Sequence, residues 1–253
     1  MHDVLAITLT AMQQDASRLD RASANLANAM TPSYKREVSV QRPLTTEPLG
    51  RSFAETMEQV PTAASGTASR DRLATLDVTR DMRPGTLRPT GQNLDLALAG
   101  PGFFEVTTES GPAYTRSGQF QVDARGRLVS AKGLPVMGIA GEIVLNGSQP
   151  TVDASGVVSD QGRVIAQLKV VDFDHRETLQ VLDGGLFSAG TSGRLLAGQD
   201  VQVRQGFLEN SNVNAMHEMV EVMQTMRHFE SLQKAVQGYD EMVGTAIRKL
   251  GDL

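Results

Sequence analysis

Apolar residues recur at alternating spacings of three and four at both ends of the chain. This pattern predicts one helix over residues 3–30 and another over residues 213–250, and it is typical of a coiled-coil seam. The helices would be about 40 Å and 55 Å long, and neither could bury its apolar stripe alone. We therefore expect the two helices to pair with each other, and to form an assembly interface with neighbouring copies, through Leu5, Leu9, Met12, Leu19, Leu26, Phe229, Leu232, Val236, Tyr239, Val243 and Leu250.

The first turns of the second helix are rich in methionine, an unbranched side chain that adapts to uneven partner surfaces. Apolar residues cover more of this helix than one partner would hide, which indicates a second, intersubunit interface. Ordinary packing within the chain remains the alternative. The positions that we assign to this interface are Met216, Val220 and Met223.

The middle of the chain has two different patterns. Residues 33–75 are polar and rich in Pro and small residues, which is typical of a linker. Residues 76–207 consist of short apolar or alternating runs separated by Gly, which predicts an antiparallel β domain. Strands are expected near residues 94–98, 103–107, 113–115, 120–122, 128–130, 143–145, 164–173, 178–182 and 201–206.

One short motif occurs twice in the β domain. Asp123-Ala-Arg-Gly126 and Asp153-Ala-Ser-Gly156 both lie between predicted strands. Asp can accept hydrogen bonds from the turn, while Gly takes the positive φ that a tight hairpin requires. Two copies are too few for a solenoid and indicate two similar hairpins.

The predicted fold is α+β, with paired, coiled-coil-like terminal helices enclosing an inserted antiparallel β-rich domain. Residues 1–32 and 208–253 would form one discontinuous helical domain, residues 33–75 a linker, and residues 76–207 the β-rich domain.

Composition excludes several classes. The 253 residues are 40% hydrophobic but only 4% aromatic, with no Trp, so the core must be mostly aliphatic. A net charge of −5 argues against nucleic acid as a main partner. The absence of Cys excludes disulfides and thiolate chemistry. The N-terminus lacks a cleavable signal pattern, so we expect either a cytoplasmic protein or one exported by another route.

No catalytic, cofactor-binding or metal site is predicted. His217-Glu-Met-Val-Glu221 has Glu where a zinc-protease helix needs its second His. Asp172, Asp174, His175, Arg176 and Glu177 form the densest titratable cluster, which we interpret as a charged hairpin tip. The chain is therefore not expected to be an enzyme or to bind a small-molecule substrate.

Three stretches resemble the signatures of the flagellar basal-body rod and hook proteins of bacteria. The first is Asn25–Arg36, where Ser33 replaces the usual Gly; the second spans Leu94–Asp123; the third is Gly206–Asn214, followed by a helix with a variant of the family's Gln-Arg-Ala-Tyr/Phe-Glu motif. The residues that carry the resemblance are Asn25, Leu26, Asn28, Thr31, Pro32, Tyr34, Lys35, Gly102, Phe103, Phe104, Tyr114, Thr115, Arg116, Gly118, Asn212, Val213, Arg227 and Glu230.

The resemblance implies a structural subunit that polymerises head-to-tail into the flagellar rod and transmits torque from motor to hook. It also implies terminal helices that form an inner tube, export through the flagellar type III apparatus without a cleaved signal peptide, and neighbouring rod subunits as partners in the periplasm. Length and the short β domain favour a proximal-rod subunit, with a distal-rod subunit as the alternative. A β-domain binding module with a helical oligomerisation stalk is the alternative from another class.

Overall fold

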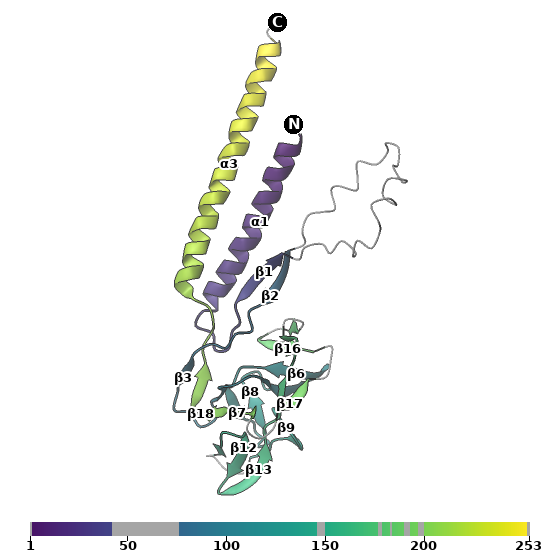
Figure 1. Cartoon of the computed structure of the whole chain (residues 1–253), viewed down its shortest axis with the longest axis vertical. Coiled ribbons are helices and arrows are strands. Elements are labelled where there is room, and N and C mark those ends of the chain that lie inside the picture. The colour runs from purple at the N-terminus through teal and green to yellow at the C-terminus, as the bar shows by residue number, and fades with distance from the viewer. Residues whose placement is uncertain are drawn as a thin grey trace, which may run out of the picture. The chain divides into compact units, whose positions relative to one another are not determined.

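The chain divides into two compact units in a computed structural model, which describes residues 2–41, 76–145, 150–176, 179–182, 184–189, 193–196 and 200–251. One unit comprises Met1–Arg36 and Asp81–Leu253, and the other is Glu37–Arg80. In the first unit, helices α1 (His2–Ala27) and α3 (Ala215–Gly251) flank an antiparallel β-rich region in the sequence (Figure 1). Neither helix has the length and apolarity needed to span a membrane. The assignment of both helices to one discontinuous helical domain stays a prediction.

The described part of the second unit is a two-stranded antiparallel ladder. Strand β1 (Glu37–Gln41) pairs with β2 (Leu76–Arg80), and Glu37 lies opposite Arg80 in the register. The guanidinium of Arg80 donates a 2.7 Å hydrogen bond to the Glu37 carboxylate. Most of the predicted linker, residues 42–75, lies outside the described residues.

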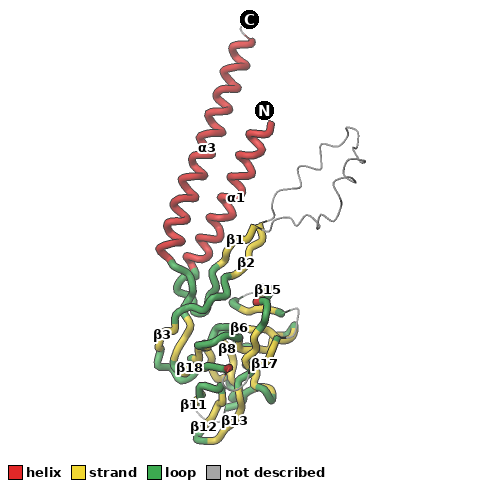
Figure 2. Tube along the Cα trace, in the orientation of Figure 1, coloured by secondary structure: helices red, strands yellow, loops and turns green. Residues whose placement is uncertain are grey.

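The β-rich region of the first unit is built from one six-stranded sheet and several smaller ladders, all antiparallel. Its strands are joined by loops (Figure 2). The six-stranded sheet has the order β15 (Gln180–Leu182), β16 (Leu186–Ser188), β6 (Gly111–Thr115), β5 (Phe103–Thr108), β14 (Val170–Asp172), β17 (Arg194–Leu196). A three-stranded sheet contains β11 (Thr151–Val152), β12 (Val157–Asp160) and β13 (Arg163–Gln167). The two-stranded ladders are β9 (Met137–Gly138) with β10 (Gly141–Glu142), β7 (Phe120–Val122) with β8 (Leu128–Ser130), β4 (Leu96–Leu98) with β18 (Val203–Gln205), and β3 (Leu87–Pro89) with β19 (Phe207–Glu209).

The antiparallel β prediction is confirmed, and one predicted strand proves to be two. Residues 164–173 read as a single apolar run, but β13 ends at Gln167 and β14 starts at Val170 in another sheet. Leu168, between the two strands, is buried in the core and forms a β-bridge with Gly138. Only Leu168 and Lys169 separate the two strands, and no Gly or Pro marks the change of sheet, so the sequence pattern alone does not reveal it.

Both repeated Asp-Ala-x-Gly motifs form the predicted turns. The Asp123 carboxylate accepts hydrogen bonds from the backbone N–H groups of Arg125 and Arg127, both at 2.8 Å. Asp153 accepts from the backbone N–H groups of Ser155 and Val157, both at 2.9 Å. The glycines that follow, Gly126 and Gly156, have φ of 79° and 80°.

The core is mainly aliphatic, as the composition predicts, and most of its aromatic rings gather in one place. A large cluster of buried side chains from both sheets contains only two rings, Phe104 and Phe120, in edge contact. A second cluster is mainly aromatic, and its rings pack at 4.8–5.9 Å between centroids. Its members are Phe103, Tyr114, Val171, Phe173, Leu179 and Phe187.

Side-chain capping sets the inner ends of both helices. Helix α1 stops at Ala27, three residues before the predicted end, because Asn28 donates from its side chain to the carbonyl of Ala24 at 2.9 Å. Helix α3 starts after Asn214, whose side-chain oxygen accepts a 3.2 Å hydrogen bond from the backbone N–H of His217. This is the geometry of an N-cap.

The prediction of a coiled-coil-like helix pair is wrong. A coiled coil buries its apolar seam positions, yet the buried side chains described in the two helices are Asp15, Ala22, Asn25, Glu218 and Thr225. Of the predicted seam, Leu9 is 59% exposed, and Met12, Leu19, Leu26, Phe229, Leu232, Val236, Tyr239 and Val243 are only half-buried. The helices contact each other antiparallel through polar groups, so the regular apolar spacing did not identify the contact surface.

The turn carboxylates predict an acid-sensitive stability. The Ser155 hydroxyl and backbone amides stabilise the charged form of Asp153 and hold its pKa below the ordinary 3.8. Because the folded-state pKa is depressed, the stabilisation is present above about pH 4 and is lost as pH falls through the folded value. Asp153→Asn keeps the acceptor oxygen but does not titrate.

We therefore expect the unfolding free energy of Asp153→Asn, measured in urea, to fall less steeply than that of the parent between pH 4 and pH 2. Asp20→Asn is the matched control, because Asp20 is exposed on α1 and makes no hydrogen bond to a described residue. Equal acid sensitivity of the parent and Asp153→Asn would contradict the assignment.

Candidate functional site

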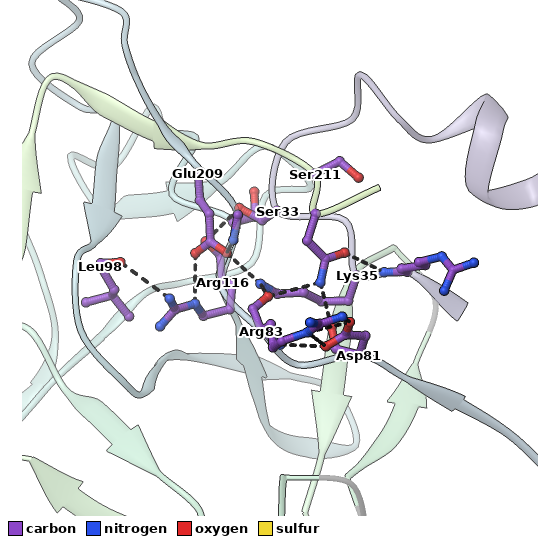
Figure 3. A network of polar contacts seen from close by, with 12 residues as sticks. Ser33, Lys35, Asp81, Arg83, Leu98, Arg116, Glu209 and Ser211 are labelled. Atoms are coloured by element: carbon purple, nitrogen blue, oxygen red, sulfur yellow. Dashed lines mark hydrogen bonds and ion pairs between the residues drawn. The ribbon is translucent and has the colours of Figure 1, made fainter. Parts of the chain in front are cut away.

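A buried carboxylate, Glu209, lies at the centre of a polar network in the first unit (Figure 3). Glu209 is the last residue of β19, and it accepts hydrogen bonds from Lys35 Nζ at 2.5 Å, Arg116 Nε at 2.9 Å and the backbone N–H of Gly85 at 2.9 Å. Its side chain and that of Lys35 are each 1% exposed. Three segments that are distant in the sequence therefore meet at one carboxylate.

The two cations are held by carbonyl groups as well as by Glu209. Lys35 Nζ donates to the carbonyl of Arg83 at 2.9 Å. Arg116 Nη1 donates to the carbonyls of Gly100 and Gly102, at 2.9 and 2.6 Å, and Nη2 donates to Leu98 at 3.3 Å. Arg116 thereby fixes the loop that leads from β4 into β5.

Two positive charges on one carboxylate leave an excess buried charge. Burial lowers the pKa of the Lys35 ammonium, and the Glu209 carboxylate opposes this shift. Burial likewise lowers the pKa of the Arg116 guanidinium, again against the effect of Glu209. The network holds only because every buried polar side-chain atom in the described residues has a hydrogen-bond partner.

Ser33 connects the segment after α1 to this network in an unusual conformation. Its φ of 59° lies in the left-handed region, which disfavours residues other than Gly. The Ser33 hydroxyl donates to the carbonyl of Arg116 at 2.8 Å, and its backbone N–H donates to the carbonyl of Glu209 at 2.8 Å. The replacement of the usual Gly by Ser thus adds a hydrogen bond at a strained position.

A second group of contacts connects the network to the helices. Arg36 Nε donates to Glu218 at 2.5 Å, and Asn25 of α1 donates to the other oxygen of Glu218 at 3.2 Å. The Asn212 side chain accepts from the Arg36 backbone N–H at 2.7 Å and donates to the carbonyl of Asp81 at 2.8 Å. The inner ends of α1 and α3 are therefore held to each other and to the β-rich region by charge-assisted hydrogen bonds.

The described residues contain no cluster of three or more His, Cys, Asp or Glu that could hold a metal ion. Within the titratable cluster at residues 172–177, Arg176 binds the Asp172 carboxylate through two 2.9 Å hydrogen bonds. Glu177 lies outside the described residues.

All three sequence signatures contribute to the network. Asn25, Tyr34 and Lys35 come from the first signature, Gly102 and Arg116 from the second, and Asn212 from the third. Gly102 has a φ of 105°, and a Cβ there would lie 2.7 Å from Val170 Cγ1. Of the other signature residues, Phe103, Phe104, Tyr114, Thr115 and Gly118 are buried, Leu26, Asn28, Pro32 and Val213 are half-buried, and Thr31, Arg227 and Glu230 are exposed.

The predicted assembly residues do not form one buried surface. Leu9, Met216, Val220 and Met223 are exposed. Nothing is described of the side chains of Leu5 and Leu250. Their role in assembly stays a prediction.

Comparison with known proteins identifies the family to which the chain is similar. Residues 204–249 match the C-terminal model described as "Flagellar basal body rod FlgEFG protein C-terminal". Residues 97–165 match the model "Flagellar hook protein FlgE/F/G D1 domain". The flagellar basal-body rod protein FlgF of Escherichia coli is 32% identical, over 97% of each chain, and that of Rhizobium meliloti is 30% identical, over 99% of each chain. The chain belongs to the flagellar basal-body rod protein family.

Proteins named FlgG are also similar to this rod-family chain. The FlgG protein of Buchnera aphidicola (subsp. Acyrthosiphon pisum) is 29% identical, over 94% of this chain and 96% of its own length. The family resemblance inferred from the three signatures is confirmed.

Sequence reasoning missed the centre of the rod-family network. Glu209 and Arg36 fall inside two of the quoted signature stretches but were not singled out, and Glu218 was passed over. A charged residue directly after the buried strand residue Leu208 was the available signal for Glu209. Nothing in the local pattern indicated that residues 35, 116 and 209 would meet.

Removing the central charge should strongly destabilise the first unit. Glu209→Gln leaves Lys35 and Arg116 buried without a counter-charge, and we expect a loss of about 3–5 kcal/mol in unfolding free energy. Urea denaturation measures the change. The matched control is Glu105→Gln, since buried Glu105 pairs at 2.7 Å with Lys169, whose side chain is partly exposed. An equal or larger loss in the control would contradict the central role of Glu209.

Ser33 offers a test of strain against hydrogen bonding. Ser33→Ala keeps the strained φ and loses the bond to Arg116, so we expect a loss of about 1 kcal/mol. Ser33→Gly loses the same bond but relieves the backbone by a comparable amount, about 1 kcal/mol, and should be close to neutral. Thermal unfolding of both variants tests this expectation. A Ser33→Ala variant that is more stable than the Ser33→Gly variant would contradict the interpretation.

Proposed function

We propose that this chain is a structural subunit of the flagellar basal-body rod and polymerises head-to-tail into the drive shaft that carries torque from motor to hook. Near-full-length similarity to FlgF proteins supports a proximal-rod subunit. Similarity of comparable extent to FlgG proteins keeps a distal-rod subunit as the alternative. The function is mechanical, and the chain is not an enzyme.

One observation carries the proposal. No apolar side chain described in α3 is buried, although the helix has 37 residues and an apolar stripe. The exposed apolar residues are Met216, Met219, Val220, Met223, Met226 and Met242. Exposed apolar surface of this extent marks an interaction site.

Contacts between copies account for this surface. A heterologous interface that does not close on itself produces an open helical filament. We assign the exposed Leu9, Met216, Val220 and Met223, with the half-buried apolar residues of both helices, to contacts with neighbouring subunits. The proposed partners are further copies of the chain, neighbouring rod subunits and the flagellar type III export apparatus, and the proposed location is the rod within the periplasm.

A charge in this surface should block assembly and spare the fold. Met223 is 52% exposed, so Met223→Asp should cost the isolated chain little stability, while burying the carboxylate against a neighbour would be unfavourable. We expect loss of swimming in a host strain lacking the native gene, with an unchanged thermal unfolding profile of the purified chain.

Gln233→Asp is the control, since Gln233 is an exposed polar residue on the same helix, and it should swim as the parent does. Normal swimming of Met223→Asp would contradict the assembly role of this surface. Failure of the parent chain itself to restore swimming would contradict the rod function.

A further inference from the structure

A hollow of about 630 Å³ lies between α1 and α3, where a coiled coil would be filled. It is lined mainly by polar residues: Asp15, Arg18, Arg36, His217, Val220, Glu221, Gln224, Thr225 and His228. The buried positions that face it, Asp15 and Thr225, are too small and too polar to close it. The free chain therefore leaves a polar recess in its helix pair.

The carboxylates of this recess already have hydrogen-bond partners. Asp15 contacts His228 Nδ1 at 2.5 Å, and Glu221 accepts from Arg36 Nη2 at 3.2 Å. Arg18 differs: its side chain is 47% exposed, its nearest carboxylate oxygen is 3.7 Å away on Asp15, and it makes no hydrogen bond to a described residue. A guanidinium carries five N–H donors. The recess thus has spare donors for a carboxylate ligand.

The register of the helices shows that α3 extends beyond the start of α1. Asn25 pairs with Glu218 and Asp15 pairs with His228, so ten residues on one helix match ten on the other, in opposite directions. Continued at that register, the start of α1 at His2 lies level with Glu241. The last turns of α3, up to Gly251, extend about 15 Å further without α1 beside them.

Two carboxylates lie where this overhang begins. Asp240 and Glu241 are both exposed, and neither side chain makes an ion pair or hydrogen bond with a described residue. Next to them Met242 is exposed, and Tyr239 and Val243 are half-buried. This segment therefore offers acceptors and apolar surface to another chain.

We propose that the recess around Arg18 receives the Asp240–Glu241 segment of a second copy of this chain. The proposal rests on the rod function above, since that function brings copies together, and it names the contact that orders them. The recess supplies the Arg18 donors, which make no hydrogen bond to a described residue and only a 3.7 Å ion pair with Asp15 in the single chain, and the segment supplies acceptors. Insertion would close the helix pair of one copy with the helix end of the next.

The chain cannot make this contact with itself. Arg18 lies level with Thr225, which lines the same recess, and Glu241 is sixteen residues further along α3, about 24 Å away. A disulfide needs Cα atoms within about 7 Å. The chain has no cysteine, so an introduced pair reports only on contact between copies.

The test is a disulfide between copies in cells. Arg18→Cys with Glu241→Cys should form a ladder of linked subunits on oxidation, seen by non-reducing electrophoresis of isolated basal bodies. Ser23→Cys with Glu241→Cys is the matched control, because Ser23 is exposed on α1 but does not line the recess, and it should stay monomeric. A motile Arg18/Glu241 strain without a ladder, or equal ladders in both strains, overturns the proposal.

A charge swap covers the case in which the cysteine pair abolishes assembly. Arg18→Glu should lose most of the swimming, and the added changes Asp240→Lys and Glu241→Lys should restore it. Normal swimming with Arg18→Glu alone, or no rescue in the combined variant, overturns the contact. Either result leaves the rod function standing as long as the parent chain restores motility, so the two failures are distinguishable.

Discussion

The structure of the first unit depends on one buried carboxylate bound by two buried cations. Glu209 joins the segment after α1, through Lys35, to the loop before β5, through Arg116. A buried ion pair adds little net stability over apolar packing, but breaking it is costly, because each remaining charge has lost its partner. Such a contact tolerates one arrangement of the chain and penalises the others. We infer that its value lies in fixing the geometry at which the helices leave the β-rich region, which a subunit in a regular polymer must reproduce in every copy.

The two helices differ from this network, because most of their apolar side chains are not buried within the chain. Their mutual contact is made by Asp15 with His228 and by Asn25 with Glu218, while their apolar residues face outward or stay half-buried. A polar contact of this kind sets register without consuming the apolar surface. In the proposed assembly that surface is available to neighbours, and its burial would supply the main driving force for association. The same spacing that resembles a coiled-coil seam is therefore better explained by contacts among several helices than by one pair.

Sequence patterns predicted the elements well and their partners poorly. The turns at Asp123 and Asp153 were predictable, because a side-chain acceptor followed by a positive-φ Gly is a local property. The two terminal helices were predictable for the same reason, since periodicity is local. The Glu209 network was not, because residues 35, 116 and 209 meet only through the sheet topology. The division of residues 163–172 into β13 and β14 was not predictable either, because the local pattern of apolar residues does not indicate which sheet a strand joins.

The β-rich core and the helices differ in how much apolar surface they bury, and this difference explains which substitutions the chain can tolerate. The aliphatic and aromatic core clusters of the β-rich region pack within one copy, although some apolar side chains of that region, such as Ile139 and Val164, stay exposed. The described helix positions bury a single apolar residue, Ala22, so in the proposed assembly most of the helical apolar surface would be stabilised only by contact with another chain. Folding and assembly therefore draw on different residues. A core substitution should act on both together, whereas a substitution on the outer helix faces should act on assembly alone.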